Sequence, residues 1–243
     1  MGFHYIDIHS HILPDLDDGA ETMAETMEML KLACEHGTRE IVATPHFGQS
    51  RYMHAQDRRN EIYREVCAQI ERAGLPIKLY LGNEIYYERS GMKCIEEKLA
   101  ETMAGTRYVL VEYSTEADYQ TILGSVRSIR QSGHSAIIAH IERYKCLINR
   151  KDLVEMLIEQ GAYIQVNAAS VYKGGVFRKY QIKNLLDAEL VHFIASDAHD
   201  TRDRRPVLDK CAHYLLKHYD EAYVKKLLWG NPKKMLRDEY IDE

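Results

Sequence analysis

Short apolar segments alternate with helix-like segments along almost the whole chain, and this alternation strongly limits the possible folds. We expect strands at residues 3–8, 40–43, 77–81, 108–111, 136–139, 163–166 and 192–195. We expect helices at residues 21–36, 57–73, 92–101, 118–131, 151–160, 179–187, 204–218 and 220–229. Each expected strand is short and almost continuously apolar, which is typical of a parallel sheet buried on both faces.

No Gly-, Ser- or Pro-rich linker divides the chain, and no internal sequence repeat is present. The strand–helix units therefore predict an α/β fold, a single-domain distorted (β/α)7 TIM-like barrel over residues 1–243. The acidic tail from about residue 237 is expected to fray. A doubly wound parallel sheet is the alternative, but it would not easily bring polar residues from so many strands to one point.

Residues that can bind a metal follow most of the expected strands. His9 and His11 close the first strand, and side chains two residues apart on a strand point to the same side. The further candidates are Asp18, His46, Glu84, Glu112, His140, Asp197 and His199. In a barrel the carboxyl ends of the strands meet at one mouth. So many donors in one cavity would repel one another or stay unsatisfied unless cations organised them.

The number and type of these donors indicate which metals would fit. They exceed the roughly four to six positions of a single ion, so they predict two or three metals that share a bridging carboxylate. No cysteine is among them, which favours Mn, Fe or Zn. Taken singly, each has an ordinary alternative, such as a hydrogen-bonded core histidine, a turn at Asp17-Asp18-Gly19 or a helix cap. The remaining histidines lack this placement and are assigned structural roles: His4, His36, His54, His134, His192, His213 and His218.

Composition and missing motifs exclude several classes of protein. The net charge of −5 gives no basic footprint for nucleic acid. No apolar run reaches the ~18 residues of a membrane span, and the start of the chain lacks a signal-peptide pattern. The five cysteines have no CxxC spacing and predict reduced thiols in a cytoplasmic protein. None is followed six residues later by Arg, as a cysteine-dependent tyrosine phosphatase requires, and neither GxxxxGK[ST] nor GxSxG occurs.

The candidate residues form one pattern that runs from residue 5 to about 235. It comprises His9-Ser10-His11, Asp18, Thr44-Pro45-His46, Glu84, Glu112, His140 with Arg143, and Ser196-Asp197-Ala198-His199. This pattern resembles the polymerase-and-histidinol-phosphatase (PHP) domain. Within it, the pattern is similar to the manganese-dependent protein-tyrosine phosphatases of the CpsB/YwqE type, encoded with capsular and exopolysaccharide genes. Phe47 departs from the family pattern, in which a second histidine is expected at this position. The departure affects the fit of the substrate and the loop at 47–56, which we expect to lie over the site.

The resemblance implies a specific site. It implies three divalent metal ions, Mn²⁺ with Fe or Zn as alternatives. The first ion would be held by His9, His11, Glu84 and Asp197, the second by the bridging Glu84 with Glu112 and His140, and the third by Asp18, His46 and His199. Arg143 and Arg204 match the arginines implied to bind the phosphoryl group, with Arg205 as the alternative to Arg204. Asp7 and Asn167 are candidates for orienting imidazoles or waters.

The resemblance also implies a function. The protein would be a metal-dependent phosphomonoesterase that acts on phosphotyrosine of a bacterial tyrosine kinase, with homo-oligomerisation left open. Water activated by the metals would attack phosphorus directly, and Asp197 or His199 could protonate the leaving group. The alternatives are a small-molecule phosphatase such as histidinol phosphatase, an amidohydrolase, or a non-catalytic binding protein on the same scaffold. An amidohydrolase would want a metal-bridging lysine where Glu84 and Glu112 stand, and a degenerate scaffold would have lost ligands.

Overall fold

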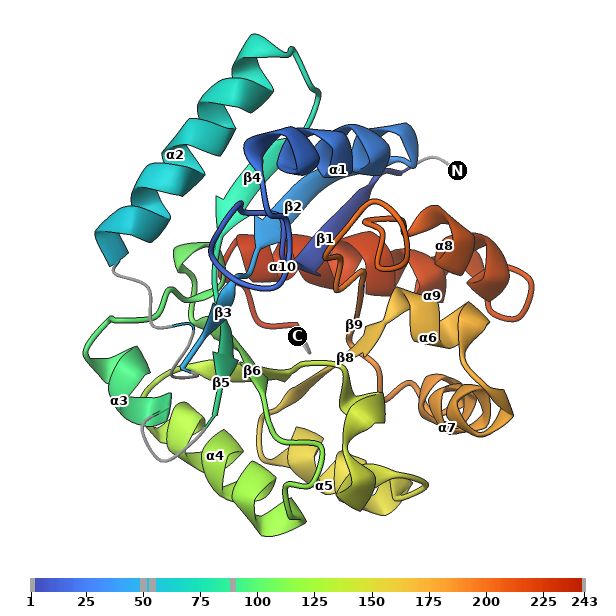
Figure 1. Ribbon diagram of the computed structural model, residues 1–243. Helices are drawn as coiled ribbons and strands as arrows, with labels where there is room; N and C mark the ends of the chain where they lie inside the picture. The colour runs from blue at the N-terminus through green and yellow to red at the C-terminus, as the bar shows by residue number, and fades with distance from the viewer. Residues whose placement is uncertain (1–2, 49–51, 53–55, 88–90, 242–243) are drawn as a thin grey trace.

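The computed structural model describes residues 3–48, 52, 56–87 and 91–241. Its strands pair in parallel and form two sheets on one curled surface (Figure 1). The first sheet has the order β1 (Tyr5–Ser10), β2 (Thr38–Ala43) and β4 (Lys78–Leu81). The second has the order β3 (His46–Phe47), β5 (Glu84–Tyr86), β6 (Tyr108–Glu112), β7 (Ser135–Ile138), β8 (Tyr163–Asn167) and β9 (Phe193–Ala195).

Two kinds of contact join the sheets. On one side, β2 leads to β3 through Thr44 and Pro45, and β4 leads to β5 through residues 82–83. On the other side, Ser10 forms a parallel bridge with Ala198, and the His11 N–H donates to the Ala198 carbonyl at 2.7 Å. The predicted α/β fold with a curled parallel sheet is therefore confirmed. The short segments β3 and β5 were not expected as separate strands.

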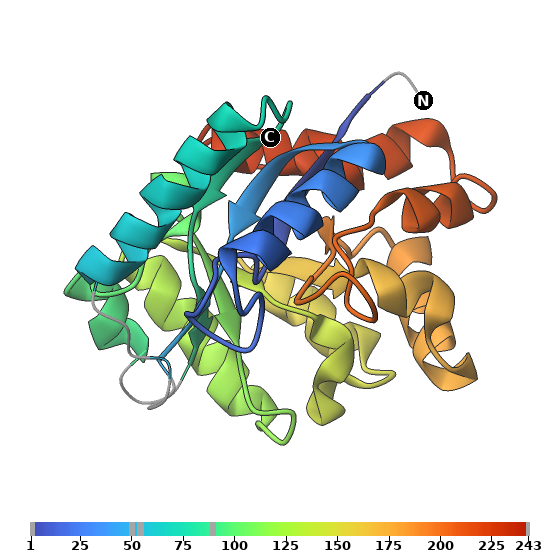
Figure 2. The same ribbon diagram turned by 45° about the horizontal axis from the view of Figure 1, so that its top comes forward.

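Helices cover the outside of the sheet (Figure 1), and α1 and α2 lie side by side (Figure 2). The helices are α1 (Met23–Glu35), α2 (Gln56–Arg72), α3 (Gly91–Glu96), α4 (Tyr119–Gln131), α5 (Lys151–Glu159), α6 (Ala168–Lys173), α7 (Val176–Asp187), α8 (Asp209–Leu215), α9 (Glu221–Lys225) and α10 (Asn231–Leu236). A π-helical turn, Lys226–Gly230, joins α9 to α10, and 3₁₀ turns occur at Met103–Gly105, Ile141–Arg143 and Lys145–Leu147. Thr22 begins α1 because its hydroxyl accepts the Glu25 N–H, and Gly37 ends it at a φ of +88°.

Some expected helices are wrong in extent. The helix expected at 204–218 spans only Asp209–Leu215. The preceding residues form a loop because the Asp200 carboxylate accepts the backbone N–H groups of Arg202, Asp203 and Arg204. The helix expected at 92–101 ends at Glu96, α7 begins earlier than expected, and α6 was not expected at all.

The core explains why the strands are apolar on both faces. One buried cluster takes side chains from six strands and lies where the curled sheet faces itself; it includes Ile6, Ile8, Val42, Tyr108, Leu110, Ile137, Tyr163 and Phe193. Two further clusters lie between the strands and the surrounding helices. Burying an apolar side chain of this size contributes about 1.5–3 kcal/mol.

The C-terminal helices close the end of the sheet opposite the strands' carboxyl ends. Lys233 binds Glu40 at 2.8 Å, and the Asn231 amide donates to the His192 carbonyl. The expected frayed tail is wrong as far as residue 241, because the Tyr108 hydroxyl donates to the Glu239 carbonyl and Ile241 is buried. Residues 242–243 lie outside the described part of the chain. Among the described residues, no helix combines the length and apolar character needed to span a membrane.

Candidate metal centre

The predicted metal-binding residues lie together at the carboxyl ends of the strands. They belong to β1, β3, β5 and β6 or to the segments that follow β1, β7 and β9. All of them are buried except His46, which is slightly exposed, and Asp18, whose side chain is about half exposed at 48%. The structure thus brings together residues from positions 9 to 199, and three groups of possible ligand atoms can be distinguished within the set.

The first group consists of His9, His11 and Glu84. The Nε2 atoms of His9 and His11 are 3.2 Å apart, and each is 3.2 Å from Glu84 Oε2. Asp197 Oδ1 lies 3.5 Å and 3.6 Å from the same two nitrogens. Two imidazole nitrogens that face each other beside two carboxylates form a suitable cage for one cation.

The second group consists of His46, Glu84 and Glu112, and His140 lies beside it. His140 Nε2 lies 2.8 Å from Glu84 Oε1 and 3.5 Å from Glu112 Oε2. His46 Nδ1 lies 3.1 Å from Glu84 Oε2 and 3.5 Å from Glu112 Oε1. Glu84 therefore contacts both groups, as a bridging carboxylate would.

The third group consists of His11, Asp18, His46 and His199. Asp18 Oδ1 lies 3.3 Å from His46 Nε2 and 3.5 Å from His199 Nε2. The groups differ from the expected ligand sets in two ways. His11 and His46 each lie in two groups, and the expected ligands His140 and Asp197 lie beside the groups without belonging to any. The grouping by distance alone therefore leaves these two imidazoles shared between neighbouring positions.

Two side chains orient the histidines of the first strand. Asp17 Oδ2 accepts the His11 Nδ1–H at 2.7 Å, and Gln165 Oε1 lies 3.2 Å from His9 Nδ1. Each contact uses Nδ1 and leaves Nε2 to face Glu84. Gln165 Oε1 also accepts the backbone N–H of His140 at 2.7 Å, so one buried amide holds two of the proposed ligands.

Close backbone approaches hold this arrangement. A side-chain carbon at Gly19 would lie 2.0 Å from the His11 carbonyl oxygen, so only glycine lets the Asp17–Gly19 turn pack against His11. His140 and Asp197 have positive φ angles of 32° and 53°. Such backbone conformations cost about 1–3 kcal/mol in non-glycine residues and are concentrated at functional sites.

Burial and charge set the protonation of the site. Burial would lower the pKa of His140, but Glu112 and Glu84 outweigh it and raise the pKa to about 9. Burial, with the neighbouring His11, lowers the pKa of His199 to about 4. Burial would raise the pKa of Asp197, but His9 and Arg143 hold it well below its ordinary value. Low pKa values suit metal ligation, since ligands must be deprotonated, and leave neither Asp197 nor His199 a proton to donate at neutral pH.

Orphaned nitrogen atoms show that the residues fit metal ions. His46 Nδ1 and His199 Nε2 are buried and make no hydrogen bond, although carboxylate oxygens lie within 3.5 Å of each. A buried polar atom left without a partner is costly and calls for an explanation such as an ion. Divalent cations bound among these imidazoles and carboxylates would satisfy both atoms.

Two arginines border the centre on one side. Arg143 Nη2 lies 2.5 Å from Asp197 Oδ2, and Arg204 Nη2 lies 2.8 Å from Asp197 Oδ1. Both line a cavity of about 140 Å³ that Asp197 also lines. Arg205 lines the same cavity without an ion pair to Asp197 among the described contacts. Arg204 is thus the better placed of the two adjacent arginines.

Comparison with known proteins assigns the chain to a family. Residues 5–237 match the family model described as "Capsular polysaccharide synthesis, CpsB/CapC". The chain belongs to the CpsB/CapC family. It is 32% identical to the tyrosine-protein phosphatase CpsB of Streptococcus pneumoniae, over 97% of this chain and 100% of that protein. It is 35% identical to the putative tyrosine-protein phosphatase CapC of Staphylococcus aureus, over 98% of this chain and 93% of that protein.

Solved structures give the same assignment. The fold matches a structure described under "Crystal structures of YwqE from Bacillus subtilis and CpsB from Streptococcus pneumoniae, unique metal-dependent tyrosine phosphatases". The TM-score is 0.89 at 28% identity, over 97% of this chain and 95% of the other. A dihydropyrimidinase from Brevibacillus agri matches with a TM-score of 0.56 at 10% identity, over 96% of this chain and 70% of that one, and shows a shared fold alone.

The other predicted residues of this CpsB/CapC chain have varied positions. Asn167 donates to Asp197 Oδ2 at 2.6 Å and accepts from Gln165, so it contacts a proposed ligand. Asp7 instead accepts the Ser196 N–H at 2.9 Å and joins β1 to the segment after β9. Phe47 is buried, and the Arg59 guanidinium lies 5.3 Å from its ring centroid.

The expected loop at 47–56 is only partly described. Tyr52 stacks on the His46 ring with centroids 5.3 Å apart, whereas residues 49–51 and 53–55 lie outside the described part. Among the histidines assigned structural roles, His36 binds Asp209 and His192 accepts the Ile164 N–H, both away from the centre. His54 lies outside the described residues.

Sequence reasoning missed two residues of this CpsB/CapC site. Asp17 was grouped with a turn, and Gln165 was not singled out. Asp17 could have been found because a carboxylate often orients a metal-binding histidine. Gln165 lies two residues before Asn167 on the same strand, so the period of two offered a weak signal.

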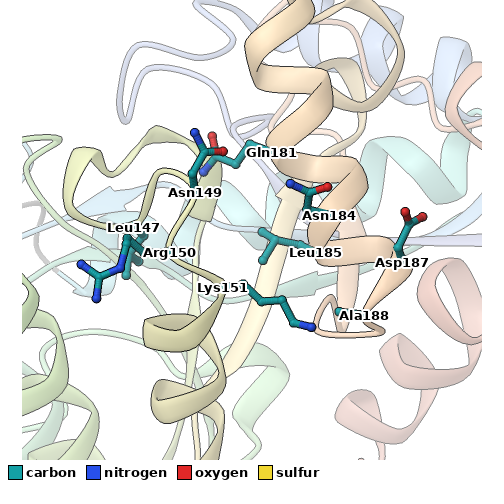
Figure 3. Close-up of a pocket in the computed structure, with 9 residues that line it drawn as sticks. All are labelled: Leu147, Asn149, Arg150, Lys151, Gln181, Asn184, Leu185, Asp187 and Ala188. Carbon is teal, nitrogen blue, oxygen red and sulfur yellow. The ribbon is translucent and has the colours of Figure 1, made fainter.

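A larger cavity, about 300 Å³, lies away from the centre between the Leu147–Lys151 segment and α7 (Figure 3). Gln181, Asn184 and Asp187 line it from α7. None of the predicted metal ligands or arginines lines this cavity. Asp197, Arg143 and Arg204 line the smaller cavity instead.

Proposed function

We propose that this protein is a metal-dependent protein-tyrosine phosphatase. The observation that carries the proposal is the convergence of buried imidazole and carboxylate groups around Glu84, with Arg143 and Arg204 both bound to Asp197 beside them. The names of the CpsB, CapC and YwqE relatives support the reaction and its dependence on metal.

The donors would hold the ions through neutral imidazoles and ionised carboxylates. When bound, the ions supply Lewis acidity and lower the pKa of a coordinated water towards ~7. Three groups of donors support three ions, and a nitrogen and oxygen set without thiolates suits Mn²⁺, Fe or Zn. We propose Mn²⁺ because the resemblance to the manganese-dependent phosphatases implies it. We propose His9, His11, Glu84 and Asp197 for one ion, Glu84, Glu112 and His140 for another, and Asp18, His46 and His199 for the third.

The arginines would bind the phosphoryl group. Arg143 and Arg204 point towards the same carboxylate from two different loops, so an anion beside Asp197 would meet both guanidinium groups. Charge-assisted hydrogen bonds to the phosphoryl oxygens would orient the ester. They would strengthen as charge moves towards the leaving oxygen, which lowers the barrier.

A phenolate leaving group reduces the need for an acid. Tyrosine has a pKa of about 10 in model peptides, so its oxygen leaves more easily than an alkyl alkoxide. Asp197 and His199 have low pKa values in the structure, and we propose that they act as ligands ahead of the acid role. This favours aryl phosphates as substrates.

Further aspects of this function are proposals of the same kind. We propose that the substrate is a phosphotyrosine protein, namely a bacterial tyrosine kinase. We also propose a cytoplasmic location, which the five free cysteines support. We propose one domain over residues 1–243. Counting β2 with β3 and β4 with β5 as interrupted strands supports a seven-stranded barrel. A homo-oligomer remains compatible with this function.

A single comparison tests the proposal. The metal-stripped protein, restored with Mn²⁺, is given a phosphotyrosine peptide and histidinol phosphate at equal concentrations. We expect the peptide to be hydrolysed with the higher kcat/KM and excess chelator to abolish activity. Preference for histidinol phosphate would instead support a small-molecule phosphatase, and full activity in excess chelator would contradict the metal mechanism.

A further inference from the structure

The cavity beside Asp197 extends past the proposed phosphoryl site. Arg143, Asn167, Asp197 and Arg204 line it at the proposed phosphoryl site, and we call the further lining residues Ser170, Tyr172, Lys173 and Arg205 the far wall. The far wall comes from α6 and from the segment before α8, which also carries Arg204, and it contains none of the proposed metal ligands. A substrate whose phosphoryl group lies at Asp197 would share the cavity with this wall.

The far wall carries positive charge that the protein does not neutralise. Arg143 and Arg204 pair with Asp197, whereas Lys173 and Arg205 form no ion pair with any described residue. One further carboxylate, that of Asp203, lines the cavity. Four cationic and two anionic side chains therefore surround the cavity, although the whole chain has a net charge of −5. An anionic group that enters the far side would be attracted, in addition to the phosphoryl group.

An exposed apolar pair lies just beyond the same wall. Val176 and Phe177, at the start of α7, are 83% and 90% exposed. They follow Lys173 after Gly174 and Gly175, so Phe177 lies at most ~14 Å from Lys173 along the chain. An extended peptide covers that distance in about four residues. A nearly bare phenylalanine this close along the chain to a charged cavity is a suitable contact for another polypeptide.

We propose that Lys173, Arg205, Val176 and Phe177 form a docking surface for the polypeptide on one side of the phosphotyrosine. Lys173 and Arg205 bind an anionic side chain near the phosphotyrosine, and Phe177 with Val176 contacts an apolar side chain within about four residues of that anion. The anion is a carboxylate or a second phosphorylated side chain, which share the same chemistry. The inference rests on the proposed phosphatase function and adds the substrate's sequence preference to it.

The test uses the Mn²⁺-loaded full chain and four substrates. Three are peptides with one hydrolysable phosphotyrosine that differ only at one flanking position. That position carries Glu, Gln or a non-hydrolysable phosphonate analogue of phosphotyrosine. The fourth, p-nitrophenyl phosphate, has no flanking residues. We expect the wild type to bind the two anionic peptides with a KM about three- to tenfold lower than that of the Gln peptide. The lower KM of the two identifies the source of the anion.

Variants then assign the preference to this surface. In Lys173→Gln/Arg205→Gln, the ratio of KM values between the Gln and Glu peptides should fall to about one, whereas Lys31→Gln, an exposed lysine on α1, should keep the wild-type ratio. A further pair of Glu peptides carries Leu or Ser at a position up to four residues beyond the Glu. The wild type should have the lower KM for the Leu peptide, and Phe177→Ser should remove this preference. Equal KM values for all three peptides in the wild type would overturn the proposal.

Two other results would overturn it in distinguishable ways. If Arg205→Gln lowers kcat on p-nitrophenyl phosphate as much as Arg204→Ala does, Arg205 belongs to the phosphoryl site. If the wild type hydrolyses none of the four substrates, the proposed function itself fails and the docking surface fails with it.

Discussion

The replacement of Asp17 by Asn tests how the centre is organised. The Asp17 carboxylate accepts three hydrogen bonds, from His11 Nδ1–H at 2.7 Å, from His46 N–H at 2.9 Å and from Gly19 N–H at 2.9 Å. An Asn side chain has one accepting oxygen and one donating NH₂ group. In either orientation the NH₂ group would face a donor that the carboxylate now satisfies.

Both orientations of the substituted amide disturb the proposed ligands. If the NH₂ group faces His11, Nδ1 must accept and the proton moves to Nε2, the atom that faces Glu84. If the NH₂ group faces Gly19, two donors meet and the turn that packs against His11 is strained. Loss of such an orienting partner lowers metal affinity by about 10–100-fold, or about 1.4–2.8 kcal/mol. Because Asp17 contacts both His11 and His46, we expect the upper part of this range.

Calorimetric titration of the metal-stripped protein with Mn²⁺ measures this effect without any assay of activity. Asp15→Asn is the matched control, because the Asp15 side chain is 76% exposed and binds only Arg58 among its described ion pairs. The control should bind Mn²⁺ as the wild type does. A folded Asp17→Asn variant, shown by its circular dichroism spectrum, that binds Mn²⁺ within about twofold of the wild type would refute the reasoning.

The remaining predictions concern the arginines, the thiols and one partly buried ion pair. Arg204→Ala should lower kcat about 10²–10³-fold with the metal content by mass spectrometry unchanged, and an unaltered kcat would remove Arg204 from the site. Burial raises the pKa of every cysteine thiol, so a variant with all five replaced by Ala should keep kcat within about threefold if it folds, and a loss of turnover would favour a thiol mechanism. Burial would raise the pKa of Glu40, but the contacts with Lys233 and Tyr80 outweigh burial and hold the pKa below 4.5. The ionised Glu40 carboxylate therefore stabilises the fold above pH 4.5, and this stabilisation is lost as the pH falls through the pKa of Glu40 in the folded protein. In urea titrations, Glu40→Gln should lower the free energy of unfolding by about 1.5–3 kcal/mol at pH 7 and by less below pH 4.5. Glu35→Gln, at an exposed position, is the control. A loss of stability in Glu40→Gln that does not depend on pH would contradict this prediction.

Much of the fold and of the candidate site could be predicted because each part depends on local patterns. The strands are apolar on both faces, since one face meets the opposite side of the curled sheet and the other meets helices. His9 and His11 could be assigned to one site from the period of a strand alone. Glu112 and His140 could be added because residues at the carboxyl ends of parallel strands meet.

The residues that were missed depend on contacts between distant segments. The sequence offers Asp17 and Asp18 side by side in a turn, and the choice of which carboxylate contacts His11 Nδ1 is decided by how Gly19 packs on His11. Gln165 is uncharged and lies within β8, and its role arises because β7 and β1 bring His140 and His9 to its amide. The helix expected at 204–218 failed for a similar reason, since the Asp200 carboxylate holds the preceding loop through backbone contacts.

Two expected strands are interrupted at the place where two proposed ligands are set. Pro45 has no N–H, so β2 cannot continue unbroken, and the Asn83 amide donates to the Pro45 carbonyl at 2.7 Å and joins the two breaks. After the breaks, His46 and Glu84 become partners in the β3–β5 register, and His46 Nδ1 lies 3.1 Å from Glu84 Oε2. In unbroken strands, successive side chains would continue to point to alternate faces of the sheet, and His46 would not have to lie beside Glu84.

The two strands are thus interrupted at the point where the centre needs an imidazole beside its bridging carboxylate. Departures from regular strand structure are expected at functional sites of this kind. Removing the contact between the breaks, in Asn83→Ala, should therefore lower the affinity of the metal-stripped protein for Mn²⁺ by about tenfold in calorimetric titration. Asn60→Ala, at a half-buried position on α2, is the control and should leave the affinity unchanged. A folded Asn83→Ala variant with wild-type affinity would show that the breaks do not set the ligands.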